Sequence, residues 1–289
     1  MKFPTSLIER ARDIHSDRPR HCFNLDKVGG IGLKVPIKVD EFVLLGNVNV
    51  YANLPGSRRG IDLSRQNYVI YKTATSAGSP EEFVLLSTKE LLEAIPYSDF
   101  VEVSVEVDIP KNETNAFGSY KTIISSSLSR RGERRNRTRV ELIGTTACPC
   151  TQELIRTYLA DISENASIIA THTQRSIGTL DVTLKEDHIN HREMAEIVEE
   201  SMSSPTRTLT KRPEEVSLVI DSICNPKFAE DVVRDMLFLL LERFSWIPDD
   251  AYVFSSVRSL ESIHKHDIYA ERSAFVADLR RELERDKSS

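Results

Sequence analysis

Two cysteines stand one residue apart in "TTACPCTQ", residues 145–152, in a chain that has 4 cysteines among 289 residues. Pro149 lies between them and favours the first position of a helix, which places Cys148 at the N-cap and Cys150 inside the first turn. Unpaired backbone N–H groups and the positive helix end stabilise a thiolate held there, and a thiolate binds metals or acts as a nucleophile. The alternative is that both thiols are small buried hydrophobic groups, and the helix start alone does not decide between the two.

Histidine and glutamate supply the other candidate chemistry. His172 lies in "THTQRS", and Glu261, His264 and His266 lie together in "ESIHKHD". Imidazole and carboxylate beside a thiolate suit zinc or ferrous iron, and a site with three protein ligands leaves a position for a water molecule that the metal ionises. A single His or Glu in a polar loop is usually a solvated surface residue. Surface positions are expected for the remaining histidines, His15, His21, His188 and His191.

The composition is that of a folded protein without a general affinity for nucleic acids or membranes. Hydrophobic residues make up 40% and charged residues 28% of the chain, which is typical of a soluble globular protein. The longest apolar run, "MLFLLL" at 236–241, is far too short to span a membrane. A net charge of −6 disfavours phosphate-rich partners. The exception is the arginine run "RRGERRNRTR", 130–139, for which a solvated hairpin turn is the favoured interpretation.

The cellular location is predicted from the N-terminus and the cysteines. The segment "MKFPTSLIERARDIH" carries charges where a secretory signal needs an unbroken apolar core. Cysteines are also too few for a disulfide framework in a chain of this length. We therefore predict a cytoplasmic protein with reduced thiols.

Alternating apolar residues predict an antiparallel sheet in the first half of the chain. The segments with this period, rich in Val and Ile, are residues 30–39, 48–54, 99–109 and 119–128. Between the second and the third, "STKELLEAI" predicts a helix, because Ser87 and Glu90 have the spacing of a capping box. The predicted order is a strand pair, a helix and a second strand pair.

The second half repeats this pattern with more helix. Strands are predicted at 136–147, 175–185 and 251–260, and helices at 149–162 and 191–202, before a charged helical tail. The strongest helix pattern covers 225–244, where Asn225 can cap the helix and Pro226 suits its first turn. Its apolar stripe consists of Phe228, Val232, Val233, Met236, Leu240 and Phe244. The predicted fold class is α+β, with two similar modules that each have a sheet and helices on one face.

An ordered set of segments resembles the signature of the type IB GTP cyclohydrolases and of their archaeal relatives in methanopterin biosynthesis. The segments are "VGGIGLKVPIKV", "CPC", "THTQRS", "KRPEE", "NPKFAEDVVRD" and "ESIHKHD", and the likeness covers most of the chain. The resemblance implies a tunnelling fold with two modules, which we place at 1–130 and 131–289, the second carrying most of the active-site motifs. It also implies a homo-oligomer, a dimer or tetramer with active sites near subunit interfaces, and a metal-dependent hydrolysis of the guanine ring of GTP.

The resemblance assigns roles to individual residues. The implied metal set is Cys148, His172 and Glu215, with Fe²⁺ favoured and Zn²⁺ or Mn²⁺ as alternatives. The implied acid–base set is Glu261, His264 and His266, which are also alternative ligands. The implied substrate-binding set is Glu230, Gln174 and Arg175. Glu230 suits the guanine edge, because an ionised carboxylate accepts from both N1–H and the 2-amino group. Cations for the triphosphate would come from Arg175, Lys211, Arg212 or the arginine run.

The connector "TQELIRTYLADISENASIIAT" after "CPC" is longer than in the bacterial members and resembles the archaeal branch. It favours 7,8-dihydroneopterin 2′,3′-cyclic phosphate as the product, with the bacterial folate-type product, 7,8-dihydroneopterin triphosphate, as the alternative. Two rival functions are a tunnelling-fold enzyme that acts on another pterin or a deazapurine precursor, and an RNA-binding module built on the arginine run. The acidic net charge and the lack of an aromatic-basic motif disfavour the RNA-binding module.

Overall fold

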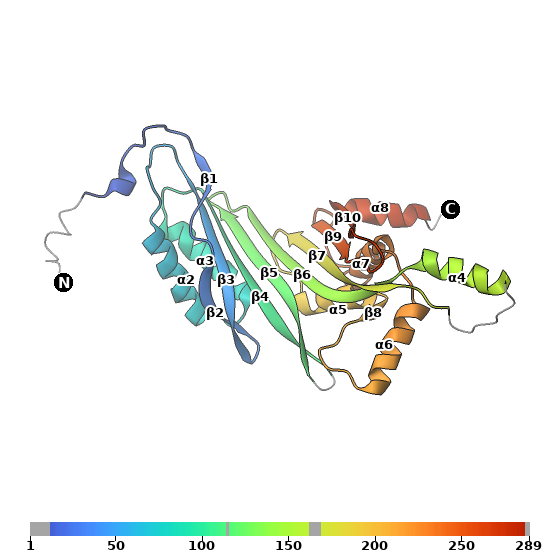
Figure 1. Ribbon diagram of the computed structural model, residues 1–289. Coiled ribbons are helices and arrows are strands. Elements are labelled where there is room, and N and C mark those ends of the chain that lie inside the picture. The colour runs from blue at the N-terminus through green and yellow to red at the C-terminus, as the bar shows by residue number, and fades with distance from the viewer. Residues whose placement is uncertain (1–11, 114–115, 162–168, 287–289) are drawn as a thin grey trace. The chain divides into compact units, whose positions relative to one another are not determined.

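Strands with helices packed against them make up the chain, and the predicted α+β class is confirmed (Figure 1). The computed structural model describes residues 12–113, 116–161 and 169–286. The start of the N-terminal segment and part of the connector after "CPC" lie outside the described residues. The chain divides into two compact units, the first formed by Met1–Glu106 with Ile124–Arg135, and the second by Val107–Ile123 with Asn136–Ser289.

The first unit contains a sheet in the order β1-β3-β4-β5, with β2 also paired to β3. Its strands are β1 (Leu25–Val28), β2 (Leu33–Val39), β3 (Phe42–Leu54), β4 (Phe100–Asn112) and β5 (Phe117–Ser129). The last two strands each contribute residues to both units. Alternate residues of β3 and β4 are buried, among them Val50 and Val103, which face each other across the antiparallel pair. The predicted strands are therefore confirmed; β3, β4 and β5 are longer than predicted, β2 begins only at Leu33, and β1 was not predicted.

Two helices, α2 (Leu63–Ser76) and α3 (Pro80–Ala94), belong to this unit, so the prediction of one helix is wrong. The predicted cap is also wrong. Ser79 caps α3, because its side chain accepts from the N–H of Glu82 at 3.2 Å and Pro80 follows at the first helical position. Ser87 lies in the middle of α3, fully buried, with its Oγ 2.7 Å from Thr73 Oγ1 of α2.

Residues 130–133 of the arginine run form the turn between β5 and β6, as the hairpin interpretation predicts, whereas residues 134–139 belong to β6. Gly132 has a φ of 84°, a left-handed conformation that glycine adopts without strain. Arg130 donates from its guanidinium to the carbonyls of Leu92, Ile95 and Ser98. At this position the arginine therefore holds the turn against the end of α3.

The second unit contains a sheet in the order β4-β5-β6-β7-β9-β10, with β8 paired to β6. Its further strands are β6 (Arg134–Ala147), β7 (Thr173–Leu184), β8 (Ser204–Pro205), β9 (Tyr252–Ser259) and β10 (Ile268–Phe275). The prediction of a charged helical tail misses β10, which pairs along its whole length with β9. Among the described residues of that tail, only α8 (Val276–Asp286) is helical.

The helices of the second unit differ from the prediction at one connection. They are α4 (Pro149–Asp161), α5 (His191–Ser201), α6 (Arg212–Cys224) and α7 (Ala229–Arg243). Asn225 does not cap α7 but ends α6, which was not predicted, and its side chain donates to the carbonyls of Met202 and Ser203. Most of the α7 stripe is buried, but Phe228, the N-cap residue, is 42% exposed. None of the helices in the described residues is long and apolar enough to cross a membrane.

Close packing brings the end of α5 onto the sheet. A Cβ at Gly144 of β6 or Gly178 of β7 would lie 2.3 or 2.6 Å from the side chain of Met202, so both positions need glycine for this approach. His191, which begins α5, is buried, and its Nδ1 lies 2.8 Å from Tyr120 Oη. The expectation of a surface position for His191 is therefore wrong.

Candidate active site

Cys148 lies directly before α4, at the end of β6, as the Cys-Pro-Cys spacing predicts. Its Sγ accepts from the backbone N–H of Thr151 at 3.4 Å, and its carbonyl accepts from the N–H of Gln152 at 3.3 Å. The thiol therefore occupies the place of a capping side chain at the positive end of the helix. Cys150, in the first turn, is exposed.

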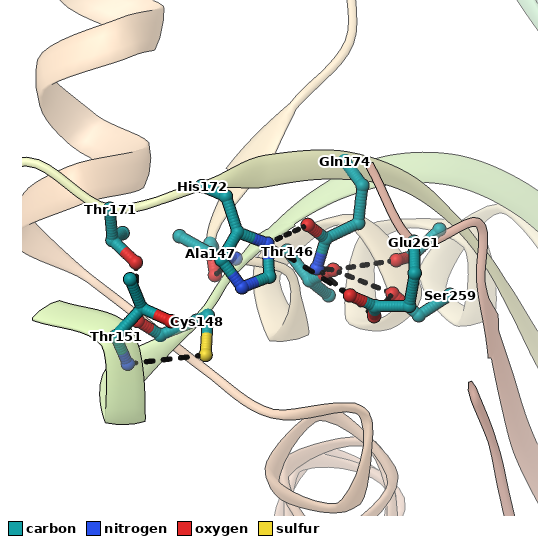
Figure 2. Close-up of polar contacts among 11 residues, drawn as sticks. Thr146, Ala147, Cys148, Thr151, Thr171, His172, Gln174, Ser259 and Glu261 are labelled. Carbon is teal, nitrogen blue, oxygen red and sulfur yellow. Dashed lines mark hydrogen bonds and ion pairs between the residues drawn. The ribbon is translucent and has the colours of Figure 1, made fainter. Parts of the chain in front are cut away.

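Strand pairing brings His172 beside Cys148. β6 and β7 are antiparallel, with Ala147 opposite Thr173, and the N–H of Cys148 donates to the carbonyl of His172 at 3.1 Å. Thr171 Oγ1 donates to the carbonyl of Cys148 at 2.6 Å. Two motifs that are far apart in the sequence thus become neighbours, and Figure 2 shows the thiol and the imidazole together.

Glu261 follows β9 and joins the same group. Its Oε2 lies 3.9 Å from His172 Nδ1, and its Oε1 accepts from Ser259 Oγ at 2.8 Å (Figure 2). The side chains of His172 and Glu261 are only 11% and 8% exposed. A carboxylate with so little solvent is held by its hydrogen bonds to the protein.

Gln174, predicted to bind substrate, lies between these two side chains. Its Oε1 is 2.9 Å from His172 Nδ1, and its Nε2 donates to Thr146 Oγ1 at 3.1 Å and to Glu261 Oε1 at 3.3 Å (Figure 2). Its amide is therefore occupied with protein groups in this structure. Thr146 stands in "TTACPCTQ" without an assigned role, and Ser259 precedes "ESIHKHD" and belongs to no motif.

Other segments close around Cys148. Gln152 of α4 donates from Nε2 to the carbonyls of Ile169 and Ile223, at 3.0 and 2.7 Å. Lys227 forms a bridge with Ala147, one residue before Cys148. This bridge anchors the segment that leads into α7, where Glu230 stands exposed in the first turn.

Arg175, also predicted to bind substrate, lies next to Gln174 on β7 and so points to the other face of the sheet. It lines a separate cavity of about 260 Å³ together with Lys111, Arg207 and Glu199. Burial raises the pKa of Glu199, but hydrogen bonds and charges from Lys111 and Arg207 outweigh this and hold the pKa below its ordinary value. The cavity therefore has three cationic side chains. Lys111 and Arg207 form ion pairs with Glu199, and Arg175 does not.

Three further predicted site residues, besides Arg175, stand apart from this group. Glu215 is exposed near the start of α6, where its Oε1 accepts from Thr210 Oγ1 at 3.4 Å. His264 and His266 are exposed between β9 and β10, with their rings stacked 5.2 Å apart. Their assignment as acid and base remains a prediction, as does that of Glu215 as a ligand.

The donor types at Cys148 and His172 fit a metal ion, but the group is incomplete. Within residues 12–113, 116–161 and 169–286, no three His, Cys, Asp or Glu side chains lie close enough together to hold one. His172 does have the partner that metal-binding histidines usually have, because Nδ1 is engaged by Gln174 and Nε2 remains for a ligand bond. Thiolate and imidazole are the donors that zinc and iron accept.

Comparison with known proteins agrees with these motifs. The sequence matches the family described as "Type I GTP cyclohydrolase folE2" over residues 11–270. The chain belongs to this family. It is 46% identical to "GTP cyclohydrolase MptA" of Korarchaeum cryptofilum, with 98% of this chain and 99% of that protein covered. It is 31% identical to the protein of the same name in Thermoplasma acidophilum, with coverage of 93% and 97%.

Solved structures show the same fold at low sequence identity. Uricase from Arthrobacter globiformis superposes with a TM-score of 0.55 at 9% identity, covering 86% of this chain and 93% of the uricase. A uricase from Bacillus fastidious has a TM-score of 0.50 at 11% identity, with coverage of 91% and 97%. The predicted tunnelling fold is thereby confirmed.

Proposed function

We propose that this chain is a GTP cyclohydrolase, a hydrolase that opens the five-membered ring of guanine and releases formate. Family membership over nearly the whole chain and the names of its relatives support the proposal. The observation that carries it is the meeting of a thiol, an imidazole and a buried carboxylate at the ends of β6, β7 and β9. Hydrolysis of a ring needs a water molecule to be activated and protons to be moved within one small site.

We propose that a divalent metal, with Fe²⁺ favoured over Zn²⁺ or Mn²⁺, is held by Cys148 and His172. The third ligand is a carboxylate, Glu215 by its motif, with Glu261 as the alternative because it already lies beside His172. When bound, the metal supplies the Lewis acid that lowers the pKa of a water molecule towards neutrality. Cys148 at the helix start favours this role, because the helix end stabilises the thiolate that a metal needs.

The chain's own side chains bind the base and move protons. Glu230, in the first turn of α7, accepts from N1–H and the 2-amino group of guanine, a pair of donors that one ionised carboxylate can satisfy. Glu261 takes a proton from the attacking water, and His264 and His266 give protons to the ring nitrogens that the reaction releases. Arg175, which lines the cavity with Lys111 and Arg207 on the other face of the sheet, is one candidate cation for the triphosphate, with Lys211 and Arg212 at the start of α6 as the alternatives.

A homo-oligomer, a dimer or tetramer acting in the cytoplasm, is also part of the proposal. Among its described residues α4 buries only Gln152, and α6 buries only Ser222. Both helices expose apolar side chains, namely Leu154 and Tyr158 on α4 and Val216, Val219 and Ile220 on α6. Packing by a second copy would cover these apolar faces. The helix α4 begins directly after Cys148, and α6 carries Glu215 in its first turn, so such an interface would lie near the proposed ligands.

The two forms of this activity differ in their product. We propose 7,8-dihydroneopterin 2′,3′-cyclic phosphate, formed when a hydroxyl of the ribose-derived chain attacks the α-phosphorus and pyrophosphate leaves. The long connector after "CPC" supports this choice over 7,8-dihydroneopterin triphosphate. Anaerobic reaction of the enzyme with GTP and Fe²⁺, followed by mass spectrometry and a pyrophosphate assay, should give formate, pyrophosphate and the cyclic phosphate. A pterin that keeps all three phosphates would establish the alternative, and no turnover of GTP would refute both.

A further inference from the structure

A chain of buried hydroxyl groups lies behind His172 and Glu261, formed by Thr146, Ser176 and Ser259, to which the sequence motifs assign no role. We propose that Thr146, Ser176 and Ser259 are positioning residues, which act through Gln174 to hold His172 in the tautomer that binds metal. The inference rests on the proposed metal site at Cys148 and His172. Its structural half, the tautomer of His172, can be tested without any metal.

The orientation of the Gln174 amide follows from the groups on either side. Glu261 Oε1 already accepts from Ser259 Oγ, so the NH₂ group of Gln174, and not its oxygen, must face that atom, at 3.3 Å. The amide oxygen then faces His172 Nδ1 at 2.9 Å and accepts its proton. In the neutral ring, a proton on Nδ1 leaves the lone pair on Nε2, which is the form that a metal requires.

The hydroxyl groups can also be given directions by counting protons. Ser259 donates its single proton to Glu261 Oε1 at 2.8 Å, so at the 3.1 Å contact with Thr146 it must be the acceptor. Thr146 has then used its own proton, and accepts from Ser176 at 2.7 Å and from Gln174 Nε2 at 3.1 Å. The hydroxyl protons of Ser176, Thr146 and Ser259 therefore all point towards Glu261, and each has an acceptor.

Water cannot take the place of these hydroxyl groups, because they are buried. Thr146, Ser176 and Ser259 are 1%, 0% and 1% exposed, and they lie on the neighbouring strands β6, β7 and β9. Ser176 lies opposite Ser259, and Gln174 opposite Thr146, so strand register alone places all four side chains on one face. Because the hydroxyls bond mainly to one another, loss of the Thr146 hydroxyl would leave Ser176 without its partner and remove one of the two acceptors of the Gln174 NH₂ group, so the amide would be held less firmly.

Ser255 provides a matched control on the same strand. It is fully buried and lies on the same face of β9 as Ser259, but its Oγ has no hydrogen-bond partner among the described residues. Ser255→Ala removes the same oxygen atom from the core as Ser259→Ala does, but it breaks no hydrogen bond that leads to Glu261. Ser255→Ala therefore separates an effect of the network from a general effect of a smaller side chain.

The first measurement is the tautomer of His172 in the metal-free enzyme. ¹⁵N–¹H correlation spectra of the imidazoles, with His172 assigned from a His172→Asn variant, should show the proton on Nδ1. Gln174→Met, which keeps the length of the side chain but removes its hydrogen bonds, should convert His172 to a mixture of tautomers. Thr146→Val should do so in part, whereas Thr146→Ser and Ser255→Ala should keep the tautomer of the wild type.

The second measurement is the affinity for Zn²⁺ alone, by competition with a chromophoric chelator. Loss of a group that orients a metal-binding histidine typically weakens binding by about 10–100-fold, and that range is expected for Gln174→Met. Thr146→Val and Ser259→Ala should weaken binding by a smaller factor, and Thr146→Ser should restore it. Ser255→Ala should bind Zn²⁺ as tightly as the wild type.

The outcomes distinguish this inference from the proposed function. A proton on Nε2 in the metal-free wild type, or a Gln174→Met variant with unchanged tautomer and Zn²⁺ affinity, would refute the positioning role. If Gln174→Met does not fold, Thr146→Val against Thr146→Ser gives the same decision. Failure of the wild type to bind metal at all, with His172 still in the Nδ1–H form, would instead refute the metal site and leave the structural half intact.

Discussion

Each unit of this protein buries a cluster of hydroxyl groups, and the two clusters end differently. In the first unit, Thr73 and Ser87 meet between α2 and α3 at 2.7 Å, and Thr73 also donates within its own helix, to the carbonyl of Val69 at 2.9 Å. In the second unit, the contact between Thr146 and Ser176 has the same length, 2.7 Å, but the chain continues to Glu261.

The difference shows that buried hydroxyls acquire a role from what stands at the end of the chain. The pair in the first unit bonds backbone carbonyls and another hydroxyl, so it can only stabilise the packing of two helices. The chain in the second unit ends on a carboxylate and, through Gln174, on an imidazole. Buried Ser and Thr side chains are therefore structural between two helices of one unit and connected to the candidate active site on the sheet of the other.

The largest effect on activity is expected from the two proposed metal ligands of the second unit. Cys148→Ala and His172→Ala should each lose metal and reduce turnover of GTP by at least about 100-fold, because each removes a ligand of the metal that activates water. Elemental analysis and single-turnover kinetics under anaerobic conditions would measure this. Cys150→Ala is the control and should be much milder. Full activity of metal-stripped enzyme in excess chelator would contradict the expectation.

A smaller effect is expected at the start of α7, which can be compared with the start of α3. Glu230→Gln keeps the shape but replaces a two-acceptor anion by an amide with one acceptor. Charge-assisted hydrogen bonds contribute about 1.5–3 kcal/mol, so kcat/KM for GTP should fall by at least about tenfold. Glu81, in the first turn of α3 in the other unit, is the matched control, and Glu81→Gln should leave kcat/KM unchanged. Unchanged kinetics of Glu230→Gln with an intact fold would show that guanine is held elsewhere.

The smallest effect on activity is expected from the first hydroxyl cluster. Thr73→Val removes the partner of the buried Ser87, which should lower the free energy of unfolding by about 1–3 kcal/mol. Denaturant unfolding should show a similar loss for Thr146→Val, but only Thr146→Val should also weaken Zn²⁺ binding. A loss of Zn²⁺ affinity in Thr73→Val would mean that the two clusters do not differ in the way proposed.

Two of the errors in the sequence-based prediction concern which of two equivalent local signals is used. Ser87 and Glu90 have the spacing of a capping box, but Ser79, followed by Pro80 and Glu82, carries the same kind of signal earlier and is the real cap. Asn225 before Pro226 likewise reads as a helix start, yet it ends α6 and binds the carbonyls of Met202 and Ser203. Local propensity permits both choices, and packing against the rest of the unit selects one.

The α+β class, most strands of both units, the family and the helix start at Cys148 can be predicted from the sequence alone. Period-2 patterns and Pro149 encode these features locally, because side-chain alternation and a fixed φ need no distant partner. The position of Gln174 between His172 and Glu261 was decided only by the tertiary structure, as was the chain from Ser176 through Thr146 to Ser259. Those contacts depend on the register of β6, β7 and β9, which places unremarkable Ser and Thr residues from distant parts of the chain on one buried face.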